Sequence, residues 1–372
     1  MIRDTDRDFA ALAKMKVPVK RAAYSDRTAW IMAILSELAY TPYDEESSQR
    51  ILDLAATLAQ LTDQKEIADR LVALQRVLAG AAPVPGAGEE SNRALKAALA
   101  AGGFELAGDA PLYDLATDTQ GFVACRRDAT GTGMAVICFR GTRQIKDWMI
   151  NIDITPVPVR DETTNAVLGN MHKGFHDAYM SVHDDIAARL SGYEDLPLYI
   201  TGHSLGGALA VVATWYQSSE RLAACYTYGA PRVGDQALID LFKTPIYRVV
   251  NAADPVPLVP PSGFTIEAAK MALRAVGSVF PLWGAINWMV ERLIKVQHFR
   301  HYGYMRYLTD ADPDAAGDYP GMRVEFAVSN TRRLIGFIQR WREGTGRRID
   351  RYHDMSQYRG KLAAYAQRRN RP

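Results

Sequence analysis

The sequence predicts an α/β fold in which a mostly parallel sheet follows a helical N-terminal region. Three observations support this prediction. From about residue 111 onward, short apolar runs alternate with helical patterns, as they do where helices connect parallel strands. One such run, within 197–213, passes through a glycine-flanked serine directly into a helical pattern. Residues 1–110 instead carry apolar residues at three- and four-residue spacing, which favours helices.

The 372 residues exceed the usual size of one domain, and the pattern divides them at about residue 110. The helical N-terminal region, 1–110, has predicted helices at 28–40, 48–61 and 64–78 and a Pro- and Gly-rich linker near 83–88. The second region, 111–372, has predicted strands at 121–126, 134–140, 198–201, 224–228 and 246–251, and predicted helices at 176–191, 206–219 and 235–242.

An apolar segment at 265–297 interrupts the second region. It carries no charge from Ala275 to Val290, and Pro281 and Gly284 break its helical pattern. The pattern predicts a broken pair of amphipathic helices that packs on the domain, while an apolar cap or a membrane-facing flap is the functional alternative.

Composition and charge narrow the class of protein. The three cysteines, Cys125, Cys138 and Cys225, are an odd number in strand-like runs, so we expect buried thiols and no disulfide framework or metal site. The net charge of +2 conceals a basic end: from Arg332 onward, twelve Arg and Lys face three acidic residues. Such a tail is typical of a solvated helical face or of peripheral contact with anionic lipid. No groove-reading motif is present, so no nucleic-acid partner is expected.

The first residues, MIRDTDRDFAALAKMK, mix acids with bases and lack the apolar core and cleavage site of a Sec signal peptide. No stretch reaches the 18 apolar residues of a transmembrane helix. We therefore expect a cytoplasmic protein, with export by a non-Sec route left open.

The run PLYITGHSLGGALAVVA, 197–213, predicts a nucleophile elbow. A serine that attacks a carbonyl carbon must stand on a strained turn between strand and helix, where neighbouring side chains would collide. Gly202 and Gly206 remove those side chains from the two flanks of Ser204. The amide of Leu205 would point into the same space and form half of an oxyanion hole.

A second strand, MAVICFR, ends at Gly141 and Thr142, and the run RQIKDWMINID follows. In hydrolases with such an elbow, the other oxyanion amide comes from a strand-to-helix loop early in the sheet, so Thr142 is the candidate donor. Ile145, Trp148 and Met149 then form an apolar stripe at i, i+3 and i+4. Such a stripe is typical of a core-facing helix, and also of a movable lid or the wall of an acyl pocket.

Taken together, these segments resemble the class 3 lipase family, an α/β-hydrolase family that includes fungal triacylglycerol lipases, plant phospholipase A1 enzymes and bacterial relatives. The matching blocks are VICFRGTRQIKDWMINID, HKGFHDAY, LYITGHSLGGALA, YTYGAPRVGD and NAADPVPLVPP, in that order. The resemblance implies an α/β-hydrolase-like catalytic domain at 111–372, with the 265–297 segment as a helical insertion. It also implies lipid-ester hydrolysis by a Ser-Asp-His triad, with no cofactor or metal.

Chain order in this fold places the acid and then the histidine after the serine. Asp254 follows the 246–251 strand in a Pro-rich turn, where the carboxyl ends of parallel strands gather, and it matches the acid of the family. Asp235 and Asp240 compete for the role, but a helix N-cap and a helical pattern account for them. We therefore predict Asp254 as the acid.

Sequence position alone does not choose among His298, His301 and His353 as the base. By resemblance, His301 matches a family segment before an outer strand, whereas His353 matches the bacterial pattern His-x-Met-x-x-Tyr-x-x-x-Leu, whose histidine is the base. We predict His353, with His301 as the alternative. The residue after His353 is Asp354, where the pattern usually has serine.

The predicted function is that of a serine hydrolase that cleaves an acylglycerol or glycerophospholipid ester through an acyl-enzyme on Ser204. The lipid ester is the expected partner, with peripheral contact at a lipid interface and no protein partner. Three alternatives remain: a soluble short-chain carboxylesterase, a non-catalytic binding module on a hydrolase fold, and a membrane-attacking lipase effector.

Overall fold

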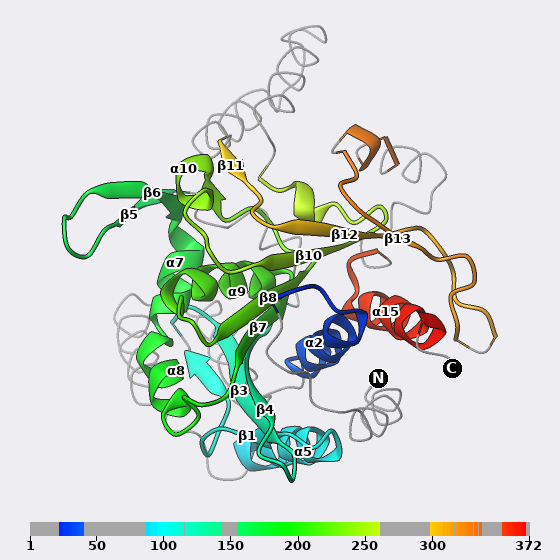
Figure 1. Cartoon of the computed structure of the whole chain (residues 1–372), viewed down its shortest axis with the longest axis horizontal. Helices are drawn as coiled ribbons and strands as arrows, with labels where there is room; N and C mark the ends of the chain where they lie inside the picture. The colour runs from blue at the N-terminus through cyan, green and yellow to red at the C-terminus, as the bar shows by residue number, and fades with distance from the viewer. Residues whose placement is uncertain are drawn as a thin grey trace, which may run out of the picture.

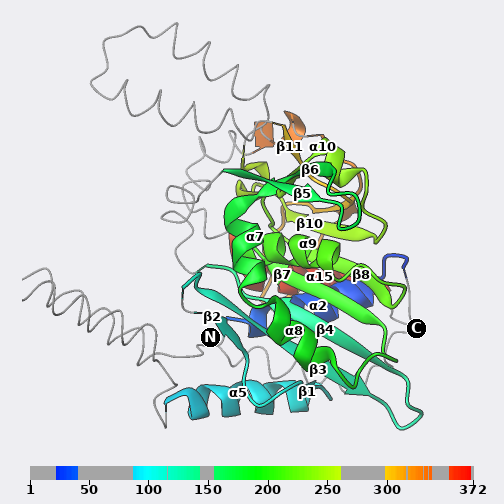
Figure 2. The ribbon, with the colours of Figure 1, turned by 90° about the vertical axis from the view of Figure 1, so that its left-hand side faces the viewer.

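The computed structural model describes residues 22–40, 87–114, 116–142, 155–260, 298–315, 317–329, 331–333, 335–336 and 352–369. Its centre is a twisted sheet with helices on both faces (Figures 1 and 2). The strands of this sheet are β1 (Glu105–Leu106), β2 (Leu112–Asp114), β3 (Thr119–Arg127), β4 (Gly133–Phe139), β7 (Leu198–His203), β8 (Leu222–Tyr228), β10 (Ile246–Asn251), β12 (Tyr304–Leu308) and β13 (Val324–Glu325).

The order of the sheet is β1-β3-β4-β7-β8-β10-β12-β13, and β2 pairs with β3 off this path. The five strands from β4 to β12 are mutually parallel, and the strands outside them pair antiparallel. The predicted α/β fold with a mostly parallel sheet is therefore confirmed. The carboxyl ends of β7, β8 and β10 lie side by side and position the candidate site.

Side chains alternate along the central strands between two buried clusters. One cluster lies on the face covered by α2 (Asp26–Leu38) and α15 (Met355–Arg369), and includes Tyr199 and Tyr226. The other lies under α7 (Lys173–Met180), α8 (His183–Leu190) and α9 (Leu205–Tyr216). Because both faces are covered, the strands are apolar throughout, as expected for a parallel sheet.

The remaining elements lie around this core. They are α5 (Ala87–Ala101), β5 (Pro156–Arg160), β6 (Val167–His172), β9 (Gly234–Asp235), α10 (Gln236–Ile239), the 3₁₀ turn η2 (Val256–Leu258) and β11 (Phe299–Arg300). Strands β11, β9, β6 and β5 form a smaller sheet. Helix α2 packs against both β7 and α15, so segments from the two ends of the chain cover one face together (Figure 1).

The predicted strands match β3, β4, β7, β8 and β10 within a few residues. The single helix predicted at 176–191 is wrong, because the chain forms α7 and α8 with a turn at Ser181 and Val182. The predictions at 48–61, 64–78 and 265–297 lie outside the described residues. All three cysteines are buried free thiols, as expected. No helix within the described ranges is long and apolar enough to cross a membrane.

Candidate active site

Ser204 lies at the junction between β7 and α9, at the carboxyl edge of the sheet. Its backbone has φ 57° and ψ −126°, a conformation that non-glycine residues rarely adopt. Its amide donates to the carbonyl of Tyr228 at 2.9 Å, which fixes the turn against the end of β8. Strain of this kind at a buried serine is the geometry expected of a nucleophile elbow.

The glycines around Ser204 are required by close backbone approaches. A Cβ on Gly202 would overlap the carbonyl of Gly206, and a Cβ on Gly206 would overlap the carbonyl of Phe139. A Cβ on Gly207 would lie 2.8 Å from that of Ala230, at the end of β8. The glycine spacing seen in the sequence therefore lets α9 begin directly against β4, β7 and β8.

Asp254 and His353 form a buried pair, although 99 residues separate them in sequence. The Nδ1 atom of His353 lies 2.8 Å from Oδ2 of Asp254, and the two residues are 1% and 2% exposed. Asp254 belongs to the turn after β10, and His353 lies two residues before α15 begins at Met355. With Asp254 ionised, Nδ1 is the protonated nitrogen, so Nε2 is left as the proton acceptor.

Two further donors hold the Asp254 carboxylate. The hydroxyl of Tyr358, on α15, donates to Oδ2 at 2.5 Å, and the amide of Val256 donates to Oδ1 at 2.9 Å. Burial and the neighbouring negative charge of Asp254 raise the pKa of Tyr358 well above its usual value, so its hydroxyl stays a donor. The carboxylate is therefore fixed from three directions.

The atoms that would exchange a proton are the ones left without partners. Ser204 Oγ and His353 Nε2 are both buried, and neither has a hydrogen-bond partner among the described residues. Gly229, next to Tyr228, borders the pair: a Cβ there would lie 2.7 Å from Oδ2 of Asp254 and 3.0 Å from Cε1 of His353. The elbow and the acid–base pair thus meet at the end of β8.

His203 connects the elbow to the backbone of His353. Its Nε2 lies 2.7 Å from the carbonyl oxygen of His353, and its Nδ1 lies 2.7 Å from the hydroxyl of Tyr40. Burial, followed by the neighbouring His353, lowers the pKa of His203 well below its usual value. The neutral ring therefore donates from Nε2 to the carbonyl and accepts from Tyr40 at Nδ1.

The loop after β4 lies against the elbow. A Cβ on Gly141 would lie 2.9 Å from the Cβ of Ser204 and 2.6 Å from the carbonyl oxygen of His203. Thr142 follows in this loop, and Leu205 is the first residue of α9, where backbone N–H groups have no partner within the helix. Ile145, Trp148 and Met149 lie outside the described residues.

His301 lies apart from this pair. Its Nε2 lies 2.7 Å from the carbonyl oxygen of Pro257, and burial, followed by the charges of Arg248 and Arg232, lowers its pKa well below the usual value. The competing acids also have structural roles: Asp235 caps α10 by accepting from the Leu238 amide, and Asp240 accepts from the Gln236 side chain. The structure brings His353, rather than His301, to Asp254.

Sequence reasoning assigned no role to Tyr358, Tyr40 or Gly229. Tyr358 is the tyrosine of the C-terminal pattern, and Gly229 lies in the matching block YTYGAPRVGD, but no sequence signal points to Tyr40. The substitution at Asp354 has a local explanation, since its exposed carboxylate accepts from the amide of Ser356 at 2.8 Å and so caps α15.

No group of side chains that could hold a metal occurs within the described part of the chain.

A family sequence model matches the part of the chain that contains the elbow and the acid. The sequence model of the family described as Lipase (class 3) matches residues 136–264, from β4 to beyond the turn that holds Asp254. The match covers 129 of the 372 residues and supports the class 3 lipase family for this segment. The family resemblance read from the sequence blocks is thus confirmed, and the class 3 lipase segment contains both the elbow and the acid.

Three curated relatives share this class 3 lipase segment. The lipase of Rhizomucor miehei is 38% identical over 160 residues, 40% of this chain and 42% of that protein. Secreted mono- and diacylglycerol lipase 1 of Fusarium solani is 33% identical over 138 residues, 35% of this chain and 40% of that protein. The chloroplastic phospholipase A(1) DAD1 of Arabidopsis thaliana is 31% identical over 192 residues, 44% and 42% of the two chains. The chain spans less than half the length of each.

Among solved structures, the native propeptide complex of Rhizomucor miehei lipase matches with a TM-score of 0.43 and 26% identity, over 63% of each chain.

Proposed function

We propose that this protein is a serine hydrolase that cleaves carboxylic esters of lipids through an acyl-enzyme on Ser204. The main support is the buried Asp254–His353 pair, which leaves His353 Nε2 as a proton acceptor. Among the described residues, neither this atom nor Ser204 Oγ has a hydrogen-bond partner. In this proposal Ser204 is the nucleophile, His353 the base and Asp254 the acid that orients the base.

The proposed mechanism follows from these positions. His353 Nε2 takes the proton of Ser204 as Oγ attacks the ester carbonyl carbon, and the imidazolium that forms is stabilised by Asp254. The amides of Thr142 and Leu205 stabilise the oxyanion, each contributing about 3 to 4 kcal/mol. The imidazolium then protonates the leaving alcohol, and water activated by His353 cleaves the acyl-enzyme.

We infer that the substrate is an acylglycerol or a glycerophospholipid. The support comes from the matched relatives, whose names include a mono- and diacylglycerol lipase and a phospholipase A1. We also propose that the chain is a bacterial-type member that works in the cytoplasm and touches a lipid interface peripherally. The C-terminal histidine pattern supports the bacterial-type assignment. The basic residues after Arg332 support peripheral contact with a lipid interface.

Labelling by a fluorophosphonate probe tests the nucleophile. We expect one equivalent of probe on Ser204 in the wild-type protein and none on the Ser204→Ala variant, identified by mass spectrometry of the labelled peptide. Ser218→Ala is the matched control, because Ser218 lies beyond the end of α9 and should leave labelling intact. Absence of labelling in a folded wild-type protein would point to a non-catalytic binding module.

An ester panel tests the substrate class. We expect hydrolysis of emulsified long-chain triacylglycerols or of glycerophospholipid vesicles to exceed that of p-nitrophenyl acetate, with Ser204→Ala losing activity about 10⁴-fold or more. A clear preference for p-nitrophenyl acetate would replace the lipase proposal with a short-chain carboxylesterase.

Expression inside and outside the inner membrane of a bacterial host would separate a toxic effector from a housekeeping enzyme.

A further inference from the structure

The backbone around His353 is held on both sides by side chains from the central sheet. The carbonyl oxygen of Tyr352, the preceding residue, accepts from Nδ2 of Asn251 at 2.9 Å. The carbonyl oxygen of His353 itself accepts from Nε2 of His203 at 2.7 Å. Asn251 is the last residue of β10 and His203 the last of β7. Two strand ends therefore hold two consecutive carbonyl groups of the segment that contains the proposed base.

These two hydrogen bonds determine where the imidazole points. A peptide group is planar, so the backbone of a residue has only two soft rotations, φ and ψ, between the planes before and after it. The carbonyl of Tyr352 lies in the plane before His353, and the carbonyl of His353 lies in the plane after it. When both planes are held, the direction of the Cα–Cβ bond is fixed, and this direction brings Nδ1 to 2.8 Å from Oδ2 of Asp254.

Asn251 connects the base to the acid. It is 1% exposed, and its carbonyl oxygen accepts from the amide of Asp254 at 2.8 Å. Its own amide donates to the Tyr358 hydroxyl at 3.0 Å, and that hydroxyl donates to the Asp254 carboxylate. The backbone of Asn251 therefore holds the acid, while its side chain holds the segment of His353.

Lys361 sets the orientation of the Asn251 amide. Its ammonium, on α15, is buried and donates to Oδ1 of Asn251 at 2.8 Å and to the carbonyl oxygen of Thr309 at 3.0 Å. An ammonium offers donors only, so it faces the amide oxygen and directs the NH₂ group to the Tyr352 carbonyl, which is an acceptor only. The reverse orientation would oppose two donors at one end and two acceptors at the other. A charge-assisted hydrogen bond of this kind is strong in a site shielded from water.

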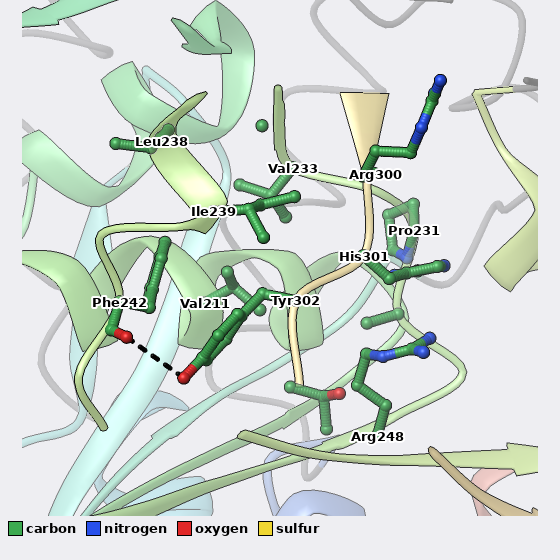
Figure 3. Close-up of a pocket in the computed structure, with 13 residues that line it drawn as sticks. Val211, Pro231, Val233, Leu238, Ile239, Phe242, Arg248, Arg300, His301 and Tyr302 are labelled. Atoms are coloured by element: carbon green, nitrogen blue, oxygen red, sulfur yellow. Dashed lines mark hydrogen bonds between the residues drawn. The ribbon is translucent and has the colours of Figure 1, made fainter. Parts of the chain in front are cut away.

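The alternative base, His301, lies outside this network. Figure 3 shows it beside Arg248 in the wall of a separate pocket. Neither Asn251 nor His353 lines that pocket, and neither does Lys361. The contacts of Asn251 and Lys361 thus serve the segment of His353.

We propose that Asn251 and Lys361 are positioning residues for the base. Asn251 holds the peptide group that precedes His353, and Lys361 acts through Asn251 by fixing the orientation of its amide. This inference rests on the proposed serine-hydrolase function and deepens it. Loss of either side chain should slow proton transfer from Ser204, because an acid–base pair that is displaced by a fraction of an ångström transfers the proton less often in the productive geometry.

Asn251→Asp tests the carbonyl contact. The change keeps the shape and keeps an acceptor for Lys361, but it replaces the donor to Tyr352 by a second oxygen. We expect the second-order rate constant for fluorophosphonate labelling of Ser204 to fall at least about tenfold, while Tm changes by no more than about 3 °C. Asn165→Asp, on the exposed turn between β5 and β6, is the matched control and should keep both values.

Lys361→Met is the second variant. It leaves the Asn251 side chain in place but removes the ammonium that orients it, so we expect a smaller fall in labelling rate, about threefold to fivefold. Lys243→Met, at an exposed lysine, is its control and should keep the wild-type rate. A wild-type labelling rate in folded Asn251→Asp or in folded Lys361→Met would overturn the proposal.

NMR gives a readout that does not depend on hydrolysis. With ¹⁵N-labelled histidine, the Nδ1 proton of His353, hydrogen-bonded to Asp254, should give a downfield signal in the wild-type protein and in Asn165→Asp. This signal should broaden or disappear in Asn251→Asp, and a change of overall stability alone would not move it. An unchanged signal in folded Asn251→Asp would overturn the positioning role.

A wild-type measurement covers the case in which neither variant folds. With ¹⁵N-labelled asparagine, one Nδ2 proton of Asn251 should exchange slowly with water, because it is held by the Tyr352 carbonyl. Rapid exchange of both Nδ2 protons would overturn the proposal.

The two proposals can fail separately. If the wild-type protein does not react with fluorophosphonate but the His353 signal depends on Asn251, the hydrolase function fails and the positioning role stands. If the wild-type protein reacts and neither the rate nor the signal depends on Asn251, the hydrolase function stands and the positioning role fails.

Discussion

The hydroxyl of Tyr358 donates to Oδ2 of Asp254, the same oxygen that accepts the Nδ1 hydrogen of His353. Tyr358 is on α15, and His353 lies just before that helix. One C-terminal helix thus positions both the proposed base and a clamp on its acid. The backbone of Asn251 extends the connection, because its amide donates to the same hydroxyl at 3.0 Å.

Tyr358→Phe removes this clamp and keeps the ring that packs in the core. Because a hydrogen bond to a buried charge is lost, we expect kcat/KM to fall about tenfold and the free energy of unfolding to fall by about 1.5 to 3 kcal/mol. Ester hydrolysis and urea denaturation measure the two effects. Tyr365→Phe on the same helix is the control and should change neither, since within the described residues its hydroxyl accepts a hydrogen bond from the exposed Arg369 at 3.4 Å and from no other residue. An unchanged kcat/KM in Tyr358→Phe would show that the clamp is dispensable.

Tyr40→Phe tests whether α2 contributes to the site. Without the Tyr40 hydroxyl, the Nδ1 atom of His203 loses its donor, and the ring is no longer held to one tautomer beneath the His353 carbonyl. We expect kcat to fall about fivefold to tenfold, because the Tyr40 hydroxyl holds His203 and also accepts a backbone hydrogen bond from Gly141, in the loop before Thr142. Tyr24→Phe is the matched control, since the buried Tyr24 hydroxyl has no partner in the described structure. Equal activities of the two variants would contradict this role.

The parts of the site that the sequence predicts are those determined locally. The elbow around Ser204 follows from glycine spacing between one strand and one helix, and Asp254 follows from its place after β10. The loop at Thr142 follows in the same way from the end of β4, and the structure places it against the elbow.

The parts that sequence reasoning missed depend on contacts between distant segments. Tyr358 meets Asp254 across 104 residues, and Tyr40 meets His203 across 163. Periodicity reports which face of an element is buried, but it does not report which polar atoms pair across the core. The single helix predicted at 176–191 failed for a local reason: apolar spacing continues through Ser181 and Val182, although the backbone turns there.

Gly229→Ala separates steric contact at the triad from backbone strain. Gly229 has φ +58°, and an added Cβ would lie 2.7 Å from Oδ2 of Asp254. We expect kcat/KM to fall at least a hundredfold, because displacement of the acid and base by about 1 Å is enough for such a loss. Gly192→Ala is the control: it has φ +89° but no atom within 4 Å of the added Cβ, so it should cost about 1 to 2 kcal/mol of stability and leave activity intact. If both variants kept activity, Gly229 would not border a working site.

Stability should fall in acid because two buried histidines remain neutral. Burial is the main cause that lowers the pKa of His203 and His301 well below 6.5. Between these lowered values and about 6.5, the unfolded chain binds protons that the folded chain does not, so the unfolding free energy decreases as pH falls. Each histidine contributes about 1.4 kcal/mol per pH unit in that window. Urea denaturation from pH 7.5 to 5 should show a slope smaller by this amount in His301→Gln, and an unchanged slope would contradict the neutral state of His301.

The identity of the base is tested by comparing His353→Ala with His301→Ala. Of these two histidines, His353 is the one that pairs with Asp254, so its loss removes the proton acceptor for Ser204, and we expect kcat to fall about 10⁴-fold or more. His301 donates to the carbonyl of Pro257 in the turn after the acid, so its loss should lower stability and reduce kcat by about tenfold at most. Initial rates on the preferred ester, with folding checked by circular dichroism, give the comparison. Near wild-type activity in His353→Ala, together with an inactive and folded His301→Ala, would transfer the role to His301.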